Sequence, residues 1–395
     1  MIVPKSATGL TYFLDPFQFS VDILMANHLP ALFRSGHVNS GKRFLNTGFP
    51  ASSTDLDGGR LGVAFYSLGT MDLLGALPEQ RERDREIWTE WLWEQQTEGE
   101  CGSGFRPSPF MTGKHPEDVT LNGEIAPQVP CTKYDSPHVI MTYTALLSLA
   151  MLRDDFSKLN RAGIIKFLRN CQRPDGSFST LPGDGESDLR TLYCAFAISS
   201  MLDDWSGIDV ERALEFVASC RTYEGGYGQT SFCEAHGGIT YIALASIYLA
   251  PPHLSEKFRL TPAEKERTIR WLMSNQSKCG GFCGRTNKEA DACYCFWCGA
   301  ALKILGASEL VDTKAMAEFL ASCQFKFGGI AKVPGEHPDP YHTYLSLAAI
   351  AMYPPEVDGD VPDSETWKLE PLDPLLNANL STAAWVRKHV PARPT

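Results

Sequence analysis

The chain of 395 residues repeats one short pattern, and this repeat restricts the possible folds more than any other feature of the sequence. Each copy has a Cys or Gln, then a glycine-rich turn, and then usually an aromatic residue. The clear copies are CQRPDGSF from Cys171, CRTYEGGY from Cys220, NQSKCGGF from Asn275 and CQFKFGGI from Cys323; a degenerate copy, QQTEGECGSGF, ends at Phe105. Spacings of about fifty residues predict an architecture of repeated supersecondary units.

The segments before and after each turn differ in kind. Before the turn they are amphipathic: in VERALEFVASCR, Val210, Leu214 and Val217 share one face, with Glu211 and Glu215 opposite. After the turn they are apolar nearly all round, as in GGITYIALASIYLA, and this pattern predicts helices that are buried on every side. We expect six such buried helices. They start near Gly62, His138, Thr191, Gly237, Ala292 and His342.

Six buried helices that alternate with six half-buried ones predict an all-α fold, a closed double ring with an inner barrel. The first outer helix is expected near Pro16–Leu32, and no segment is predicted to be a β-strand. Strict alternation makes the inner helices parallel, so that their positive N-termini and unpaired N–H groups meet at one end and form a site suited to an anion. An open α-solenoid is the alternative, but it would not need inner helices that are apolar all round.

Basic residues gather where the inner helices begin. They are His138, His236, His342, Arg60, Arg190, Arg285 and Lys288. Capping of helix N-termini favours acidic and hydroxyl residues, so capping explains Asp188 and Asp291 but not these bases. A bound anion would explain them.

The stretch CGGFCGRTNKEADACYCFWCG, Cys279–Gly299, holds five of the 12 cysteines. Cys295 and Cys298 lie inside an apolar helix and are predicted to be buried thiols that behave as small hydrophobic residues. Asp291 and Cys293 could face one metal ion if Asp291 is the N-cap, and His342 is the candidate third ligand. Three ligands with an open position are typical of catalytic zinc, but spacing alone leaves the structural interpretation open as well.

The composition limits the partners and the compartment. A net charge of −11 argues against nucleic acid as the main partner. The longest apolar stretch, Ile239–Ala250, is shorter than the roughly 20 residues that span a bilayer, so no transmembrane segment is expected. The start of the chain lacks a basic region followed by an apolar run, so no secretory signal is expected. Scattered cysteines then indicate reduced thiols in the cytoplasm.

Five motifs make the chain resemble the β subunits of the CaaX protein prenyltransferases, most of all those of protein geranylgeranyltransferase type I. They are YDSPHVIMTYTAL, CRTYEGGYG, EAHGG, GFCGRTNKEADACYCFWCGAALKIL and HPDPYHTY. The resemblance extends from about Asp57 to Met352. It implies an α–α toroid, with residues 1–395 as one domain, a core of about 57–352, and a tail of 354–395 with a short helix near Ser381–His389.

The resemblance also implies the roles of individual residues. The zinc ligands of the family fall on Asp291, Cys293 and His342. The diphosphate-binding positions fall on His236, Arg285, Lys288 and Tyr294, with Lys332 added as a further cation. The isoprenoid-binding positions fall on Gly62, Arg190, Tyr193, Gly237, Gly238 and Trp297. The peptide-binding positions fall on His138 and Ile140, and Leu345 replaces an aromatic residue at a pocket-lining position.

Two of these positions distinguish the sub-families. Farnesyltransferases carry a Trp where this chain has Gly62, so the missing side chain leaves room for a fourth isoprene unit. Farnesyltransferases also carry a Mg²⁺-binding Asp where this chain has Lys332, and a lysine supplies positive charge directly. The resemblance therefore implies C20 transfer without Mg²⁺.

The implied activity is transfer of geranylgeranyl from geranylgeranyl diphosphate to the cysteine of a C-terminal CaaX motif, which forms a thioether. It implies one Zn²⁺ per β subunit to activate the thiol, an α subunit as partner, and CaaX-ending substrates such as Rho-type small GTPases. Farnesyltransferase β is the main alternative, followed by the Rab geranylgeranyltransferase β subunit. A terpene cyclase would have a DxDD motif, which this chain lacks, and a non-catalytic toroid would not need Asp291, Cys293 and His342 together.

Overall fold

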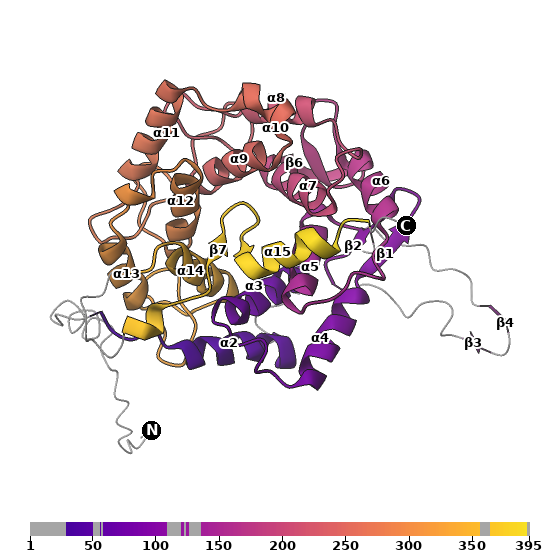
Figure 1. Ribbon diagram of the computed structural model, residues 1–395, viewed down its shortest axis with the longest axis horizontal. Helices are drawn as coiled ribbons and strands as arrows, with labels where there is room; N and C mark the ends of the chain where they lie inside the picture. The colour runs from indigo at the N-terminus through magenta and orange to yellow at the C-terminus, as the bar shows by residue number, and fades with distance from the viewer. Residues whose placement is uncertain are drawn as a thin grey trace, which may run out of the picture.

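The computed structural model describes residues 29–49, 56, 58–108, 136–355 and 364–392, and the backbone of 120–121 and 124–125. The helices form two concentric rings (Figure 1). The inner ring consists of α3 (Arg60–Leu73), α5 (Val139–Met151), α7 (Leu189–Leu202), α9 (Gly237–Leu249), α12 (Ala292–Ile304) and α14 (Pro340–Met352). The outer ring consists of α2 (Arg34–Thr47), α4 (Glu82–Trp93), α6 (Arg161–Cys171), α8 (Val210–Ser219), α11 (Pro262–Ser274) and α13 (Thr313–Ser322). The predicted closed toroid is confirmed.

The burial of the two rings follows their sequence patterns. On α8, Val210, Leu214 and Val217 are buried while Glu211 and Glu215 are exposed. On α9, every residue from Gly237 to Ile247 is buried, because this helix packs between α7 and α12 within the inner ring. Within the part of the chain that the structure describes, every helix is too short or too polar to span a bilayer.

The described part of the chain has an outer helix before α3 at Arg34–Thr47, beyond the expected range of Pro16–Leu32. Residues 29–33 lie outside any helix, the helix before α3 is α2, and residues 16–28 of the predicted range lie outside the described residues. The sequence of α2, RSGHVNSGKRFLNT, lacks an apolar stripe. Its backbone instead approaches α3 closely: a Cβ at Gly41 would lie 3.0 Å from the carbonyl oxygen of Ser67. Packing through a glycine leaves no periodic pattern of apolar residues from which the helix could be predicted.

The prediction that the chain has no strands was wrong. The described residues contain four short two-stranded antiparallel hairpins. They are β1 (Gln96–Gly99) with β2 (Gly102–Phe105), β3 (Thr120–Leu121) with β4 (Glu124–Ile125), β5 (Phe178–Leu181) with β6 (Asp184–Asp188), and β7 (Leu372–Asp373) with β8 (Ala378–Asn379). These strands are too short to show an alternating pattern of apolar and polar residues. In β5–β6 the sequence signal for a hairpin is Gly183, which lies in the turn with φ +71°.

Short segments complete the fold. A four-residue helix, α10 (Pro252–Ser255), follows α9, and three 3₁₀ turns lie at η5 (Glu256–Phe258), η6 (Ser308–Leu310) and η7 (Ser364–Trp367). The C-terminal helix α15 (Leu380–His389) packs on α5 and α7, which confirms the short helix expected in the tail.

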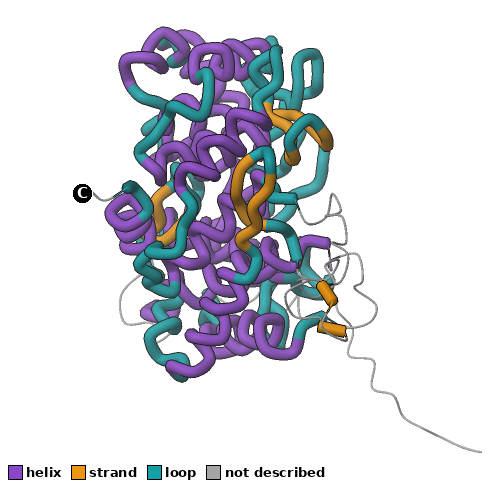
Figure 2. Tube along the Cα trace, turned by 90° about the vertical axis from the view of Figure 1, so that its right-hand side faces the viewer, coloured by secondary structure: helices purple, strands orange, loops and turns teal. Residues whose placement is uncertain are grey.

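The two ends of the barrel differ. Hairpins and turns lead into the inner helices at one end, and the C-terminal segment lies at the other (Figure 2). The loop between β7 and β8 is tied to the inner ring by three tyrosine hydroxyls. Tyr143 donates to the carbonyl of Leu376 (2.8 Å), and Tyr193 donates to that of Leu375 (2.9 Å). Tyr344 donates to the carbonyl of Asn377 (2.6 Å). The C-terminal segment therefore covers the end opposite the inner N-termini.

Candidate metal centre and anion site

The start of α12 brings Asp291 and Cys293 together. Asp291 is the N-cap in an extended conformation (φ −142°, ψ 134°), and its side chain accepts a hydrogen bond from the backbone N–H of Cys293 (2.9 Å). Because Asp291 stands outside the helix, its carboxylate lies beside the Cys293 thiol instead of on the opposite face. Gly306, with φ +67°, follows the helix as the expected C-terminal stop. The predicted cap is confirmed.

His342, in the first turn of α14, completes a triad with these two residues. One ligand atom from each of Asp291, Cys293 and His342 lies within 4.8 Å of the others. Nε2 of His342 is 3.4 Å from Oδ1 of Asp291. Asp291 and Cys293 are buried, and His342 is half-buried. A carboxylate, a thiol and an imidazole are the donor set of a catalytic zinc site, so the three residues fit such an ion.

The electrostatics of the triad favour bound protons when no cation is present. Burial lowers the pKa of His342, but hydrogen bonds to Asp291 and Asp339 outweigh that effect and raise the pKa to about 9. Burial, together with the Asp291 carboxylate, raises the pKa of the Cys293 thiol above its ordinary value. Metal binding must therefore displace protons from both groups, which makes the affinity depend on pH.

Tyr294 and His236 form a polar pair next to the triad. Nδ1 of His236 accepts a hydrogen bond from the N–H of Gly238 (3.1 Å), and its Nε2 lies 3.0 Å from the Tyr294 hydroxyl. Burial, and then the charge of Arg285, lowers the pKa of His236, so the ring is neutral near pH 7. Because Nδ1 accepts, Nε2 carries the proton and donates to the oxygen of Tyr294. The Tyr294 hydroxyl proton is then directed to another acceptor.

The loop before α12 carries the cations. Arg285 pairs with Glu234 across 3.1 Å, and Lys288 closes a turn through its N–H to the carbonyl of Arg285 (3.3 Å). The N–H of Gly237 donates to the carbonyl of Gly284 (2.8 Å), which joins this loop to the start of α9. The carbonyl of exposed Lys332 accepts the N–H of Ala292 (2.9 Å). These contacts place the backbone of Lys332 beside the start of α12 and that of Arg285 and Lys288 in the loop before it.

The proposed lipid-binding residues lie along the inner ring. The hydroxyl of Tyr193 lies 3.3 Å from the hydroxyl of Tyr143 and 3.3 Å from that of Tyr241. Trp297 packs against Tyr241 with ring centroids 5.3 Å apart and donates from Nε1 to the Tyr341 hydroxyl (3.0 Å). These aromatic side chains come from neighbouring inner helices and form an apolar wall inside the barrel.

Three glycines of the set differ in what surrounds them. A Cβ at Gly237 would lie 2.6 Å from Sγ of Cys298, so Gly237 allows α9 and α12 to pack closely. A Cβ at Gly238 would lie 3.6 Å from the Trp297 ring. A Cβ at Gly62 would lie 3.8 Å from Cε of Met141, which is an ordinary van der Waals contact, so a methyl group would fit there.

The remaining predicted residues have distinct environments. Arg190 forms ion pairs with Asp188 (2.7 Å) and Glu186 (2.5 Å). Nδ1 of His138 is buried without a hydrogen-bond partner, and burial lowers the pKa of this ring to about 4. Ile140 is half-buried on α5 and Leu345 is fully buried on α14. A buried imidazole nitrogen without a partner is uncommon in folded proteins.

Asp339 and Tyr341 were not predicted from the sequence to belong to the site. Asp339 caps α14 and contacts His342, and Tyr341 accepts the Trp297 hydrogen bond. The signal for Asp339 is Asp followed by Pro at the first helical position, which is typical of a helix start.

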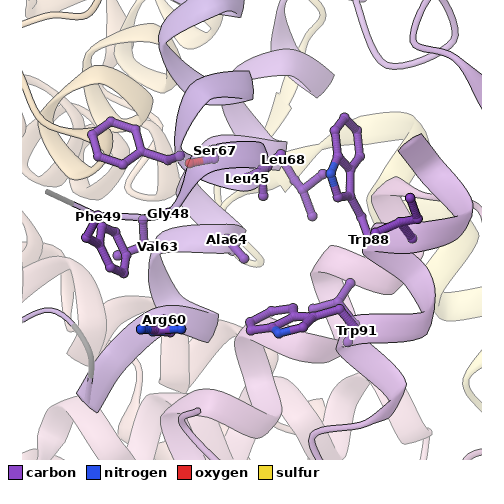
Figure 3. Close-up of a pocket in the computed structure, with 13 residues that line it drawn as sticks. Leu45, Gly48, Phe49, Arg60, Val63, Ala64, Ser67, Leu68, Trp88 and Trp91 are labelled. Carbon is purple, nitrogen blue, oxygen red and sulfur yellow. The ribbon is translucent and has the colours of Figure 1, made fainter. Parts of the chain in front are cut away.

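A separate cavity of about 190 Å³ lies between α2, α3 and α4 (Figure 3). Trp88 and Trp91 of α4 face it, and on α3 its wall is formed by Val63 and Ala64. Neither Gly62 nor the triad lines this cavity, so it is not part of the candidate site.

Comparison with known proteins agrees with the fold. The family model described as "Prenyltransferase alpha-alpha toroid domain" matches residues 32–378. The chain therefore belongs to the prenyltransferase α–α toroid family.

Similar curated proteins include β subunits of type-1 geranylgeranyl transferases and of farnesyltransferases. The chain is 36% identical over 303 residues to the geranylgeranyl transferase type-1 β subunit of Arabidopsis thaliana. The aligned region covers 74% of this chain and 78% of that protein. It is 36% identical over 360 residues to the Dictyostelium discoideum type-1 β subunit, which covers 88% and 96%. The farnesyltransferase β subunit of Schizosaccharomyces pombe is 28% identical over 356 residues, with coverage of 84% and 80%. The resemblance to type I subunits is confirmed.

A solved structure shares the fold. Candida albicans protein geranylgeranyltransferase-I complexed with GGPP matches with a TM-score of 0.76 at 24% identity, which covers 92% of this chain and 100% of that chain.

Proposed function

We propose that this chain is the catalytic β subunit of a protein geranylgeranyltransferase type I. The reaction transfers the C20 group from geranylgeranyl diphosphate to the cysteine of a C-terminal CaaX motif. One observation carries the proposal: Asp291, Cys293 and His342 converge from two neighbouring inner helices, with one ligand atom of each within 4.8 Å of the others.

The triad would hold one zinc ion per chain. When bound, zinc supplies a thiolate nucleophile from the substrate cysteine, because a coordinated thiol is deprotonated near neutral pH. The cysteine sulfur forms a bond to C1 of the lipid while the bond from C1 to the diphosphate oxygen breaks. Negative charge therefore accumulates on the diphosphate as it leaves.

This chain's own residues stabilise the leaving diphosphate. Nε2–H of His236 donates to the Tyr294 oxygen, so the Tyr294 hydroxyl can donate to a diphosphate oxygen. Arg285 and Lys288 add positive charge from the adjoining loop, and the diphosphate would compete with Glu234 for Arg285. Lys332 adds a third cation, which supports catalysis without Mg²⁺.

The inner ring would hold the lipid. Tyr193 and Trp297 provide apolar surface, Gly238 leaves the Trp297 ring open, and Gly62 leaves space for a fourth isoprene unit. Burial of the lipid's hydrocarbon chain, at about 0.8 kcal/mol per CH₂, gives tight binding of the lipid. Gly237 and Arg190 support the start of this pocket, and His138, Ile140 and Leu345 would contact the substrate peptide.

The partners of the reaction are also part of the proposal. A helical α subunit completes the enzyme, and CaaX-ending proteins such as Rho-type small GTPases are the substrates, in the cytoplasm. That residues 1–395 form one domain stays a prediction. The alternative, a farnesyltransferase β subunit, would transfer a C15 group.

A competition assay tests this proposal. The chain is co-expressed with an α subunit and offered equal C15 and C20 diphosphates with CaaX peptides that end in Leu or Met. We expect C20 transfer to the Leu peptide, unaffected by chelation of Mg²⁺. Preferred C15 transfer would identify a farnesyltransferase, and absence of transfer with both lipids would refute a catalytic role.

A further inference from the structure

We propose that Asp339 is a positioning residue for the metal centre: it fixes the orientation and the tautomer of His342. This inference rests on the proposed zinc site. Oδ1 of Asp339 accepts the backbone N–H of His342 (2.9 Å), and Oδ2 lies 2.6 Å from Nδ1 of the same residue. One carboxylate therefore holds both the main chain and the side chain of the ligand.

The two ring nitrogens of His342 face different carboxylates. Nδ1 faces Asp339, and Nε2 faces Asp291 at 3.4 Å. Both carboxylates belong to N-caps of neighbouring inner helices, Asp339 on α14 and Asp291 on α12. Asp291, and not Asp339, forms the triad with Cys293, so Asp291 is the carboxylate that would share the metal and Asp339 is the one that orients the ring.

The chemistry of the contact determines the tautomer. An ionised carboxylate only accepts hydrogen bonds, so Nδ1 must carry the proton that Asp339 receives. When the ring is neutral, as a metal ligand must be, the lone pair then stands on Nε2, the nitrogen that faces Asp291 of the triad. Carboxylate–histidine–metal arrangements of this kind commonly strengthen metal binding.

The backbone around Asp339 is rigid, which makes the contact a fixed one. The Asp339 carbonyl accepts hydrogen bonds from the N–H (3.0 Å) and the hydroxyl (2.7 Å) of Thr343. The Thr343 hydroxyl in turn accepts the N–H of Ile330 (2.9 Å), and Pro340 occupies the first helical position. Asp339 is therefore held by the strand-like turn after α13 as well as by its own helix.

Two substitutions separate orientation of the ring from helix capping. Asp339→Ser retains a good N-cap but cannot reach Nδ1. Asp339→Asn also caps, but its amide would donate to Nδ1 and move the imidazole proton to Nε2, where it blocks the metal. A matched control is Asp312→Asn, because Asp312 caps α13 in the same way, through the N–H of Ala315 (3.0 Å), away from the triad.

The experiment measures zinc affinity in the complex with an α subunit, by competition of the metal-stripped protein with a chromophoric chelator. We expect both Asp339 variants to bind zinc 10- to 100-fold more weakly than the wild type and Asp312→Asn to match it. Geranylgeranyl diphosphate binding should be retained in all three variants, which shows that they are folded. Cobalt(II) should still give the thiolate charge-transfer band in Asp339→Ser, since Cys293 remains.

The outcomes distinguish this inference from the proposed function. Wild-type zinc affinity in both Asp339 variants, with the wild type holding one zinc, would overturn the positioning role and leave the zinc site intact. A tenfold or greater loss in Asp312→Asn would also overturn it, because the effect would then be one of capping. Failure of the wild type to hold zinc would refute the proposed metal site and this inference with it.

Discussion

Gly62 is the position where one substitution should change the lipid that the protein selects. Gly62 lies on the same face of α3 as Phe65 and Tyr66, whose rings contact Tyr344 and Tyr341 of the inner ring. A Cβ there would lie at an ordinary contact distance of 3.8 Å from Met141, and we expect the lipid to occupy the space that a larger side chain would need. A Trp at this position should exclude one five-carbon isoprene unit. At about 0.8 kcal/mol per carbon, the loss is about 4 kcal/mol, or roughly 1,000-fold in C20 affinity.

The assay is competition between C15 and C20 diphosphates, both for binding and for turnover, with an α subunit present. Gly62→Trp should reverse the preference toward C15. Gly62→Ala is the matched control: its methyl group fits at ordinary contact distance from Met141, so C20 preference should persist while helix propensity gains about 0.5–1 kcal/mol. An unchanged C20 preference in Gly62→Trp would refute the pocket argument.

Two further predictions concern charge. Lys332→Asp should lower turnover without Mg²⁺ and restore part of it when Mg²⁺ is added, because the carboxylate replaces a fixed cation with a metal-binding group; a variant that stays indifferent to Mg²⁺ would contradict this role. Buried Asp72 of α3 accepts a hydrogen bond from Thr382 of α15 (2.7 Å), and burial raises its pKa from 3.8 to about 6. Because folding raises the pKa of this carboxyl, ionisation of Asp72 lowers the free energy of unfolding as the pH rises from about 4 to 6. Asp72→Asn removes that charge and should stabilise the fold by about 3 kcal/mol at pH 8 and far less at pH 4. Thermal unfolding at both pH values measures this, and an equal gain at both would show that the Asp72 charge is not the cause.

The clustering of Asp291, Cys293 and His342 was predictable from the sequence because its geometry is largely local. Asp291 as an N-cap and Cys293 two residues later are visible in one stretch of sequence, and the repeat brings the start of α14 next to the start of α12. The repeat also predicted both rings of helices, since burial all round leaves a pattern that differs from an amphipathic stripe.

Other features leave no such pattern. The position of α2 depends on the close approach of Gly41 to α3. A glycine in a polar segment does not by itself predict a packed helix. The bonds from Tyr143 and Tyr193 to the C-terminal loop join residues 233 and 182 positions apart, beyond any local period. Asp339 was visible in HPDPYHTY, but Asp before Pro at a helix start is equally expected of an ordinary cap. Only its 2.6 Å contact with Nδ1 of His342 sets it apart.

The most direct test of the account is the zinc content of the purified complex with an α subunit, wild type beside Cys293→Ala. We expect one zinc per β chain in the wild type. We expect Cys293→Ala to lose both zinc and turnover, while geranylgeranyl diphosphate still binds through Arg285, Lys288 and Tyr294. Stoichiometric zinc in Cys293→Ala would contradict the assignment of the metal to this triad.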